Sequence, residues 1–519
     1  MDGATKGKGM NKHFCMMPPF PGGGHDLTEG AAMKAAAVAE QGILQTAGLN
    51  DPAPFDMKRH LHGAHLGQAL ASAASPRPFN VLTVLVDFPD KANVEEAQYF
   101  QDLIYGETGS VRAYYQGQSQ GRLDITPNQT LVWMRLPRDY TFYVNNNYGF
   151  GSYPHNSQGM VADIVAQLVQ MKVDLSIYDN DGDGYVDGLL VVHAGTGAEL
   201  SGKATDMWSH KWQVQAIPVG SVYVSEYAVM PEYWVWPTTK MTIGVFCHEA
   251  GHLFGLPDLY DIDGSSYGLH YWDIMATGSW LGSYGDHPCG FSAPQLLSLG
   301  FREPRGVPFT RQVTLGANEF VRIPVAHGDT GKFYTVGYRR KAGQDAKLPF
   351  GGIQVCRVDH SMHGNASEWT PGADPTRHYE VAQIQPDNEW ALERRTAGKY
   401  GLRGDLYPLW KDDGSGWVTI FGPTTEPSSK WYDGSETNVS MKVVGDVTQT
   451  SDTITVEVSS MSLQGDVNGD GVVDAEDINA LVQILFFGAP ATEGADVLGD
   501  GELDARDLNK LIDIVYYGG

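Results

Sequence analysis

The chain has 519 residues, which is too long for a single hydrophobic core and predicts about three or four domains. Its formal net charge of −26 argues against nucleic acid or an anionic membrane surface as a partner, and no apolar run is long enough to predict a membrane span. Only four cysteines occur, widely spaced, which excludes a disulfide scaffold.

Residues 1–76 are rich in Ala, Gly, Pro and His, with helix-compatible stretches such as GAAMKAAAVAEQGILQ. This composition is typical of a leader or pro-segment-like region more than of a domain with its own core. The first residues contain no apolar run of the kind found in secretory signal peptides, so no signal peptide is visible in this chain. Either the chain is shown without one, or it is not exported by that route.

Residues 77–305 alternate between strand and helix patterns. The β-branched run NVLTVLVDFPD predicts a buried strand, and DGLLVVHAG predicts a second one. Helical patterns lie between them, at GSVRAYYQGQ and QGMVADIVAQLVQM. This alternation favours an α/β domain over the whole range.

Residues 306–459 consist of short apolar runs separated by Gly, Asp and Asn turns, among them KFYTVGYRR, GGIQVCRVDH and SDTITVEVSS. Such a pattern predicts an antiparallel β-rich domain, sandwich-like in its architecture.

Residues 460–519 form an acidic tail with an internal repeat. They carry twelve acidic and two basic side chains, which suggests cation sites. The segment Asp466–Gly471 aligns with Asp496–Gly501, and the apolar residues behind each segment recur at i, i+3, i+4 and i+7. These apolar sets are Ile478, Leu481, Val482 and Leu485 in the first repeat and Leu508, Leu511, Ile512 and Val515 in the second. The tail is therefore expected to be two loop–helix units that bury their apolar faces against each other.

The stretch GVFCHEAGHLFGLPDLYD in the α/β region holds a candidate zinc site. His248 and His252 are four residues apart, so on a helix both imidazoles face the same side and can bind one ion. Glu249 beside them can act as the general base. Zinc lowers the pKa of a bound water towards ~7, and Glu249 would accept its proton and pass it to the leaving amine.

A catalytic zinc usually has three protein ligands, and Asp258 is the candidate for the third. On an unbroken helix, a residue ten positions after His248 would lie about 15 Å further along the axis. Gly255 can adopt a positive φ and end the helix, and Pro257 prevents its resumption. The chain can then fold back and bring Asp258 to the metal, and Asp261 is the first alternative to test.

This HExxHxxGxxD arrangement resembles that of the metzincin metalloproteases, and the segment Trp272–Gly278, which reads WDIMATG, is similar to their methionine turn. Together HEAGHLFGLPDLYD, YWDIMATGSW, YDNDGDGYVDG and VVHAGTGAE resemble the immune inhibitor A-like family of secreted bacterial metalloproteases. The resemblance covers about residues 77–445. It implies a multidomain zinc endopeptidase with an α/β metzincin-like zincin catalytic domain at 77–305, acting on protein or peptide substrates. Met275 would pack beneath the metal without binding it.

A calcium loop is predicted directly before the second buried strand. Oxygen-bearing residues stand at loop positions 1, 3, 5 and 9, and a backbone carbonyl is expected at position 7. The predicted ligands are Asp179, Asp181, Asp183, Tyr185 and Asp187. Position 12 is Leu190 and a strand follows, so the loop is no EF-hand and its last ligand must come from elsewhere.

The two C-terminal loops have the same ligand spacing, and each precedes a predicted helix. The predicted calcium ligands of the first loop are Asp466, Asn468, Asp470, Val472, Asp474 and Asp477. Those of the second loop are Asp496, Asp500, Glu502, Asp504 and Asp507. Leu498 stands where the second loop needs an oxygen, so we expect a weaker second site.

Duplicated units of this kind resemble a type I dockerin, a small all-α calcium-binding module. The resemblance implies a cohesin domain of a scaffold protein as the partner, as in a cellulosome. The cohesin would be recognised through Ala475–Glu476 and Ala505–Arg506.

The sequence thus favours a secreted or extracellular zinc endopeptidase, either free or part of a cell-surface complex. One alternative is a catalytically weak or inactive component of the same assembly that binds protein or glycan. Another is a protease directed at glycoproteins. The intact Glu249 and the complete ligand set favour an active enzyme.

Overall fold

The computed structural model describes residues 77–517 with short gaps, together with the strand β1 (Cys15–Met16). The gaps are residues 128, 236–237, 262–263, 306–309, 326–330, 363, 396–402, 412–413, 438, 446–450, 460–464, 469–472 and 499. Apart from β1, the expected pro-segment-like region 1–76 lies outside the described residues. None of the helices in the described part of the chain has the length and apolarity needed to cross a bilayer.

A mixed seven-stranded sheet forms the centre of the first region, in the order β1-β7-β8-β6-β3-β5, with β9 paired to β8. Its parallel strands are β3 (Leu82–Asp87), β5 (Trp133–Arg135), β6 (Leu189–Thr196) and β8 (Val222–Val235). The antiparallel strands are β1, β7 (His210–Val219) and β9 (Thr239–Lys240). Two further strands, β2 (Arg77–Asn80) and β4 (Leu123–Thr126), form a separate parallel pair. The strands β3 and β6 confirm the two predicted buried strands.

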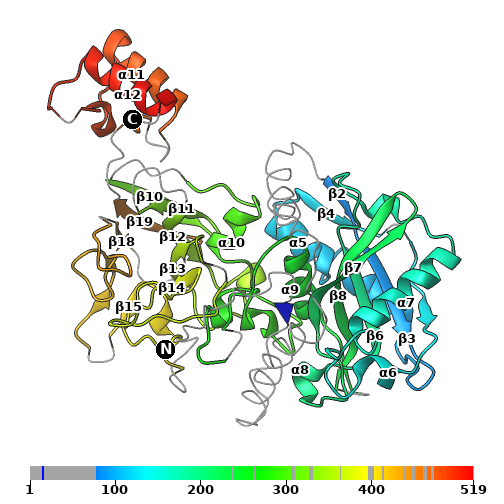
Figure 1. Ribbon diagram of the computed structural model, residues 1–519. Coiled ribbons are helices and arrows are strands. Elements are labelled where there is room, and N and C mark those ends of the chain that lie inside the picture. Colours follow the sequence, from blue (N-terminus) through cyan, green and yellow to red (C-terminus); the bar gives the residue numbers. More distant parts are fainter. Residues whose placement is uncertain are drawn as a thin grey trace, which may run out of the picture.

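Helices cover both faces of this sheet (Figure 1). His210 of β7 contacts Ser157, the first residue of α7 (Ser157–Gln170), and the charge of its neighbour Lys211 acts on Glu249 of α9 (Ile243–Leu253). Because successive residues of a strand point to opposite faces, α7 and α9 lie on opposite sides of the sheet.

The helix α5 (Val111–Gln118) packs beside α9, since the Tyr115 hydroxyl donates to the carbonyl oxygen of Cys247 at 2.7 Å. Further helices of this region are α4 (Ala97–Tyr105), α6 (Tyr140–Val144), α8 (Ala198–Ser201) and α10 (Ala293–Ser298). The 3-10 helices are η1 (Ser176–Tyr178), η2 (His270–Trp272), η3 (Thr277–Trp280), η4 (Gly343–Asp345), η5 (Arg403–Asp405) and η6 (Glu493–Ala495).

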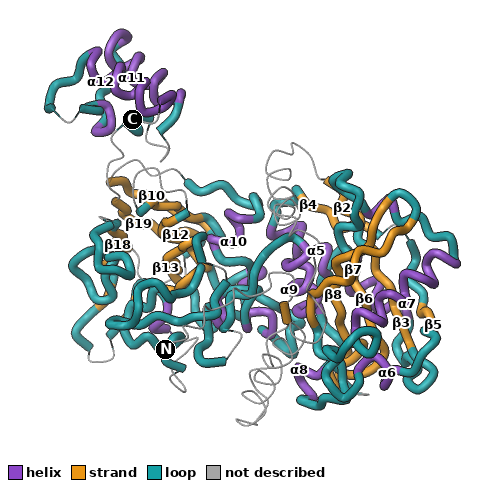
Figure 2. Tube along the Cα trace, viewed as in Figure 1, coloured by secondary structure: helices purple, strands orange, loops and turns teal. Residues whose placement is uncertain are grey.

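The second region contains two four-stranded antiparallel sheets, in the orders β10-β19-β18-β17 and β11-β12-β13-β14 (Figure 2). The first consists of β10 (Thr310–Gly316), β17 (Ile420–Phe421), β18 (Ser440–Val444) and β19 (Thr453–Ser459). The second consists of β11 (Phe320–Pro324), β12 (Lys332–Arg339), β13 (Gly352–Asp359) and β14 (Val381–Gln383). The hairpin of β15 (Leu409–Trp410) and β16 (Trp417–Val418) stands apart from both sheets.

The sheet β11–β14 takes part in two hydrophobic cores. Phe333 belongs to the core of the first region, and its neighbour Tyr334 belongs to the core shared by the two antiparallel sheets. In β13, Cys356 belongs to the core of the first region, and its neighbour Val355 belongs to the core shared by the two antiparallel sheets. The core around the mixed sheet therefore continues past residue 305, where the sequence pattern changes.

The tail folds around a small core of its own, with α11 (Ala475–Phe487) and α12 (Ala505–Tyr517) side by side at the top of Figure 1. Leu481 and Leu511, which are equivalent in the two repeats, are both fully buried. Asp474 is the N-cap of α11, and its side chain accepts a hydrogen bond from the backbone N–H of Glu476.

Candidate metal centre

The helix α9 lies entirely in the core and ends where the sequence predicts. All of its residues are buried, and its last residue is Leu253. Gly255 then adopts a φ of +89°, and the backbone N–H of Leu256 donates to the carbonyl of Gly251 at 3.1 Å. The prediction that the helix ends at Gly255 and that the chain turns back is confirmed.

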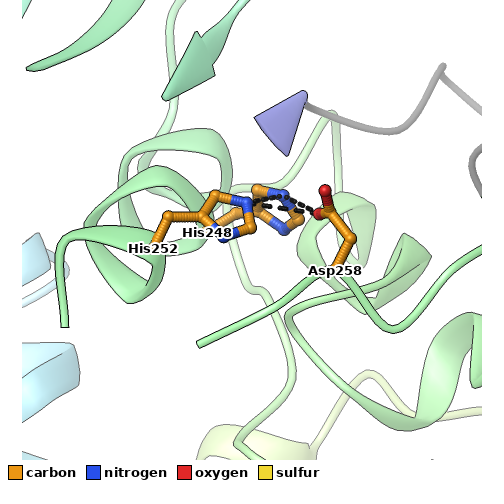
Figure 3. A group of neighbouring side chains, drawn as sticks. All are labelled: His248, His252 and Asp258. Atoms are coloured by element: carbon orange, nitrogen blue, oxygen red, sulfur yellow. Dashed lines mark hydrogen bonds and ion pairs between the residues drawn. The ribbon is translucent and has the colours of Figure 1, made fainter. Parts of the chain in front are cut away.

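The turn brings His248, His252 and Asp258 together (Figure 3). The two histidine Nε2 atoms are 3.1 Å apart, and the Oδ1 atom of Asp258 lies 3.2 Å from each of them. All three side chains are buried, with Asp258 the most exposed at 8%.

The hydrogen bonds of the imidazoles determine which nitrogens face the centre of this group. Nδ1 of His248 contacts the carbonyl oxygen of Ile274 at 2.8 Å, and Nδ1 of His252 contacts that of Leu256 at 2.8 Å. Because a carbonyl oxygen only accepts, Nδ1 is the donor in both rings and each Nε2 presents a lone pair. Burial also lowers the pKa of His252, which favours the neutral ring that a metal requires.

The three acceptor atoms fit a small divalent cation. Ligand atoms about 2.0–2.1 Å from one tetrahedral ion lie about 3.3–3.4 Å apart. The observed separations of 3.1–3.2 Å are close to this value. Two neutral imidazoles and a carboxylate also match the nitrogen and oxygen ligands that zinc takes.

Glu249 lies beside this group. Both of its carboxylate oxygens are buried and accept no hydrogen bond from the described residues. Burial raises the pKa of Glu249 well above its ordinary value, and the carboxylates of Asp258 and Glu199 raise it further, while the Lys211 ammonium lowers it. A buried carboxyl with free oxygens beside a cation site can take up and release a proton.

The methionine turn, Trp272–Gly278, supports the site from below. Met275 is fully buried, and a Cβ atom on Gly251 of α9 would come within 2.5 Å of its Sδ atom. The glycine in HEAGH therefore lets the helix lie directly on the methionine. Met275 therefore packs against α9 at Gly251, which stands between the two histidines in the chain. Its place beneath a bound metal stays a prediction.

Asp261, the alternative third ligand, lies outside the group. Its Oδ2 atom accepts hydrogen bonds from the hydroxyl of Ser265 at 2.7 Å and from the backbone N–H of Ser266 at 2.9 Å. These bonds hold it within its own loop.

The predicted calcium loop brings three of its acidic residues together. Carboxylate oxygens of Asp179, Asp181 and Asp187 lie within 4.8 Å of one another. Asp183 is not part of this group, and its Oδ1 accepts from the backbone N–H of Tyr185 at 2.8 Å. The side-chain oxygen of Asn180 in the same loop accepts from the backbone N–H of Asn80 at 2.7 Å.

The first C-terminal loop is closed by its last predicted ligand. Asp477 is fully buried, and its Oδ1 accepts from the backbone N–H groups of Val467 and Asn468 at 2.7 and 2.9 Å. Asp466 is 3% exposed. Asp470 and Val472 lie outside the described residues.

In the second loop, Asp507 accepts from the N–H of Leu498 at 3.0 Å, as its counterpart does in the first loop. A cation of the chain itself also lies in this loop. The guanidinium of Arg506 contacts the carboxylates of Asp500, Glu502 and Asp504 at 3.2, 3.1 and 2.9 Å.

Some residues at the metal centre carry no signal in the sequence. The carbonyl groups of Ile274 and Leu256 orient the histidines, and any residue type has a carbonyl. Lys211 stands in β7, directly opposite Cys15 of the edge strand β1 in the pairing of the two strands. Its effect on Glu249 depends on strand pairing and could not be predicted from spacing. His210, the neighbour of Lys211, is buried against α7.

Comparison with known proteins identifies two domain families in the chain. Residues 70–297 match the immune inhibitor A peptidase M6 catalytic domain, and residues 464–515 match the dockerin type I domain. The "Pre-pro-metalloprotease PrtV" of Vibrio cholerae serotype O1 is 28% identical over 46% of this chain and 32% of its own length. "Immune inhibitor A" of Bacillus thuringiensis subsp. alesti is 27% identical over 44% of this chain and 41% of its own. The chain thus spans less than half the length of either relative.

These matches place the first region in the class of the metallopeptidases. More particularly, the chain contains an immune inhibitor A peptidase M6 catalytic domain, followed at its C-terminal end by a type I dockerin.

Proposed function

We propose that the chain is a zinc-dependent endopeptidase of the metzincin type, acting outside the cell on protein or peptide substrates. The observation that carries this proposal is the group of three acceptor atoms 3.1–3.2 Å apart, with the buried Glu249 beside them. His248, His252 and Asp258 would hold the ion. When bound, zinc supplies the Lewis acidity that polarises the scissile carbonyl and makes water a nucleophile near neutral pH.

Glu249 is the proposed general base. Its carboxylate would accept the proton of the attacking water and deliver it to the nitrogen of the leaving amine. Burial raises the pKa of this carboxyl and so favours its protonated form, and the positive charge of Lys211 acts in the opposite direction. The lysine therefore shifts Glu249 towards the ionised form that a general base requires, against the larger effect of burial.

The side of β7 on which β1 pairs is the proposed place for the substrate backbone. Within the described residues, β1 pairs with this side in antiparallel register, Cys15 opposite Lys211 and Met16 opposite His210. An extended peptide can add to an exposed sheet edge through the same main-chain hydrogen bonds. This places the peptide beside Lys211, whose charge acts on Glu249.

We propose further that the tail binds a cohesin in the presence of calcium and holds the enzyme on an extracellular scaffold. Besides the match to dockerin type I, the ends of α11 and α12 support a binding role. Phe486 and Phe487 are 62% and 72% exposed, and Tyr516 and Tyr517, 30 residues further on, are 64% and 82% exposed. Exposed aromatic pairs at equivalent places of a repeat are typical of interaction surfaces.

The proposed activity is tested with casein as a generic substrate. The full chain should hydrolyse it, a chelator such as 1,10-phenanthroline should stop the reaction, and added zinc should restore it. No hydrolysis at any zinc concentration would favour the inactive binding component instead. A glycosylated protein and its deglycosylated form, digested in parallel, would show whether glycans direct the cleavage.

A further inference from the structure

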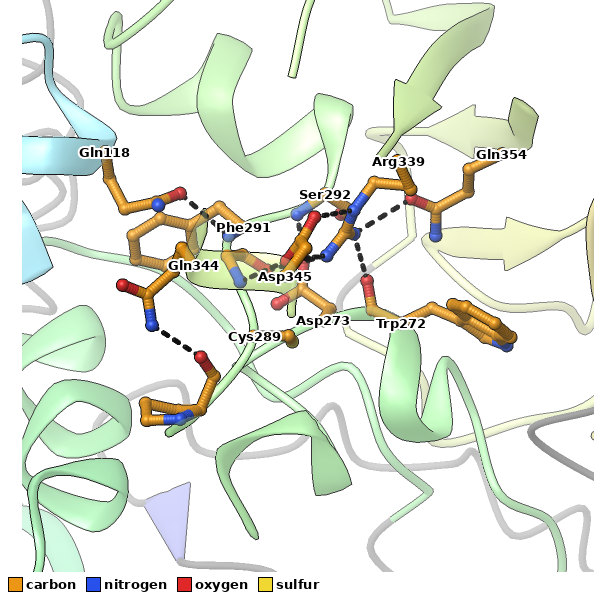
Figure 4. A network of polar contacts seen from close by, with 12 residues as sticks. Gln118, Trp272, Asp273, Cys289, Phe291, Ser292, Arg339, Gln344, Asp345 and Gln354 are labelled. Atoms are coloured by element: carbon orange, nitrogen blue, oxygen red, sulfur yellow. Dashed lines mark hydrogen bonds and ion pairs between the residues drawn. The ribbon is translucent and has the colours of Figure 1, made fainter. Parts of the chain in front are cut away.

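The guanidinium of Arg339 is buried where the sheet β11–β14 meets the methionine turn (Figure 4). Nε and Nη2 donate to the two carboxylate oxygens of Asp345 at 2.8 and 2.9 Å. Nη1 donates to the carbonyl of Trp272 at 2.5 Å and to Oε1 of Gln354 at 3.1 Å. Nη2 also donates to the carbonyl of Gly290 at 3.2 Å. All five guanidinium N–H groups therefore have an acceptor.

The chain continues from Trp272 directly to the metal centre. Oδ1 of the next residue, Asp273, accepts from the backbone N–H of Met275 at 2.7 Å, and Oδ2 accepts from that of Ser292 at 2.7 Å. Between Asp273 and Met275, the carbonyl of Ile274 accepts the Nδ1–H of His248. Only one residue, Asp273, thus separates Trp272, whose carbonyl Arg339 holds, from Ile274, whose carbonyl orients a proposed metal ligand.

We infer that Arg339 is a positioning residue for the metal centre, although it belongs to the β-rich region and lies outside the matched catalytic domain. By holding the backbone of the methionine turn, it fixes the Ile274 carbonyl and through it the ring of His248. The inference rests on the proposed metal centre and adds a residue to it. The loss of a partner that orients a metal-binding histidine typically lowers metal affinity by about 10–100-fold.

Arg357 provides a matched control on the opposite face of the same sheet. It is 3% exposed, against 2% for Arg339. Its Nε donates to the hydroxyl of Tyr334 at 2.8 Å, and its Nη2 donates to the carbonyl of Lys430 at 3.0 Å. It also lies over the ring of Tyr432, 4.5 Å from the centroid. Its replacement should affect packing and stability, but it has no hydrogen bond to the methionine turn.

The experiment compares Arg339→Lys with Arg357→Lys in the full chain. A lysine keeps the charge near Asp345 but has three donors in place of five, so it cannot serve all the acceptors. Each purified protein is stripped of metal and titrated with Co²⁺ in competition with a chelator. The visible absorption of the bound Co²⁺ reports the ligand geometry, and thermal melting without metal reports the fold.

We expect Arg339→Lys to bind Co²⁺ about tenfold more weakly than the unaltered chain, with a changed absorption spectrum. Arg357→Lys should stay within about threefold, whatever its melting temperature. An unchanged affinity and spectrum in a folded Arg339→Lys protein would overturn the inference. If that variant does not fold, Asp345→Asn, which removes the carboxylate that fixes the guanidinium, decides by the same criterion. If the unaltered chain itself binds no Co²⁺, the proposed metal centre fails instead.

Discussion

Gly251 of α9 lies so close to Met275 that a Cβ atom on the glycine would come within 2.5 Å of the methionine Sδ. The carbonyl of the same methionine accepts from the backbone N–H of Leu259 at 2.7 Å, next to Asp258. One buried turn therefore supports both the helix with the two histidines and the segment with the carboxylate. The spacing of the three acceptor atoms is set by packing.

Replacing Asp258 with Ala should abolish tight zinc binding and hydrolysis while the fold persists, because the contacts of the turn do not involve this side chain. Zinc content is measured by atomic absorption after dialysis, with near-ultraviolet circular dichroism as the test of folding. Asp261→Asn is the control, since the Asp261 carboxylate is hydrogen-bonded within its own loop. If Asp258→Ala keeps its full zinc content and Asp261→Asn loses it, Asp261 and not Asp258 is the third ligand.

Calcium should stabilise the catalytic domain through the loop around Asp181. A ligand that binds only the folded state adds ~2.7 kcal/mol at a hundredfold excess over its Kd. A chain ending at Ser459, which lacks the tail, should therefore melt at a higher temperature with calcium than with a calcium chelator. Asp181→Ala should remove this increase, whereas Asp174→Ala, in the adjacent exposed turn, should keep it. Equal calcium-dependent shifts of the melting temperature in both variants would show that this loop binds no calcium.

In the tail, the first loop should bind calcium more tightly than the second. The Leu498 side chain offers no oxygen, and the Arg506 guanidinium already forms ion pairs with three carboxylates of the second loop. Asp466→Ala should thus unfold the tail and end calcium-dependent cohesin binding, while Asp496→Ala should cost less. Arg506→Ala should strengthen the second site, because a competing cation is removed. Calorimetry that finds two equally tight sites in the unaltered tail would contradict this ranking.

Glu393 should make the stability of the β-rich region depend on pH. Burial raises the pKa of this carboxyl to about 7, from an ordinary value of 4.5. The folded state then holds the proton between about pH 4.5 and pH 7 while the unfolded chain releases it, so stability falls as the pH rises through this window. The loss is at most about 3 kcal/mol.

Glu393→Gln removes this titration and can keep the hydrogen bond from Gln385. The difference in melting temperature, variant minus unaltered chain, should be larger at pH 8 than at pH 5. A difference between the two proteins that is the same at both pH values would show that Glu393 is ionised throughout.

Much of the metal centre could be predicted because its signals are local. The four-residue spacing of His248 and His252 needs only helix geometry, and the return of Asp258 needs only Gly255 and Pro257. The buried strands β3 and β6 could also be predicted, because short β-branched runs bounded by turn residues are typical of buried strands.

Contacts between distant segments could not be predicted. Arg339 and Trp272 are 67 residues apart, and nothing in KFYTVGYRR indicates which acceptor the arginine meets. The change of pattern at residue 305 is a local property of the sequence, whereas the core that crosses it depends on packing. For the same reason the pairing of β1 with β7 lies beyond the reach of composition and periodicity.

The most direct test of the account is Glu249→Gln, compared with the unaltered chain for zinc content and for casein hydrolysis. Because Glu249 is placed as the base and not as a ligand, the variant should retain about one zinc per chain while its turnover falls by at least ~10²–10⁴-fold. A variant that holds zinc and hydrolyses casein at a near-normal rate would contradict the account.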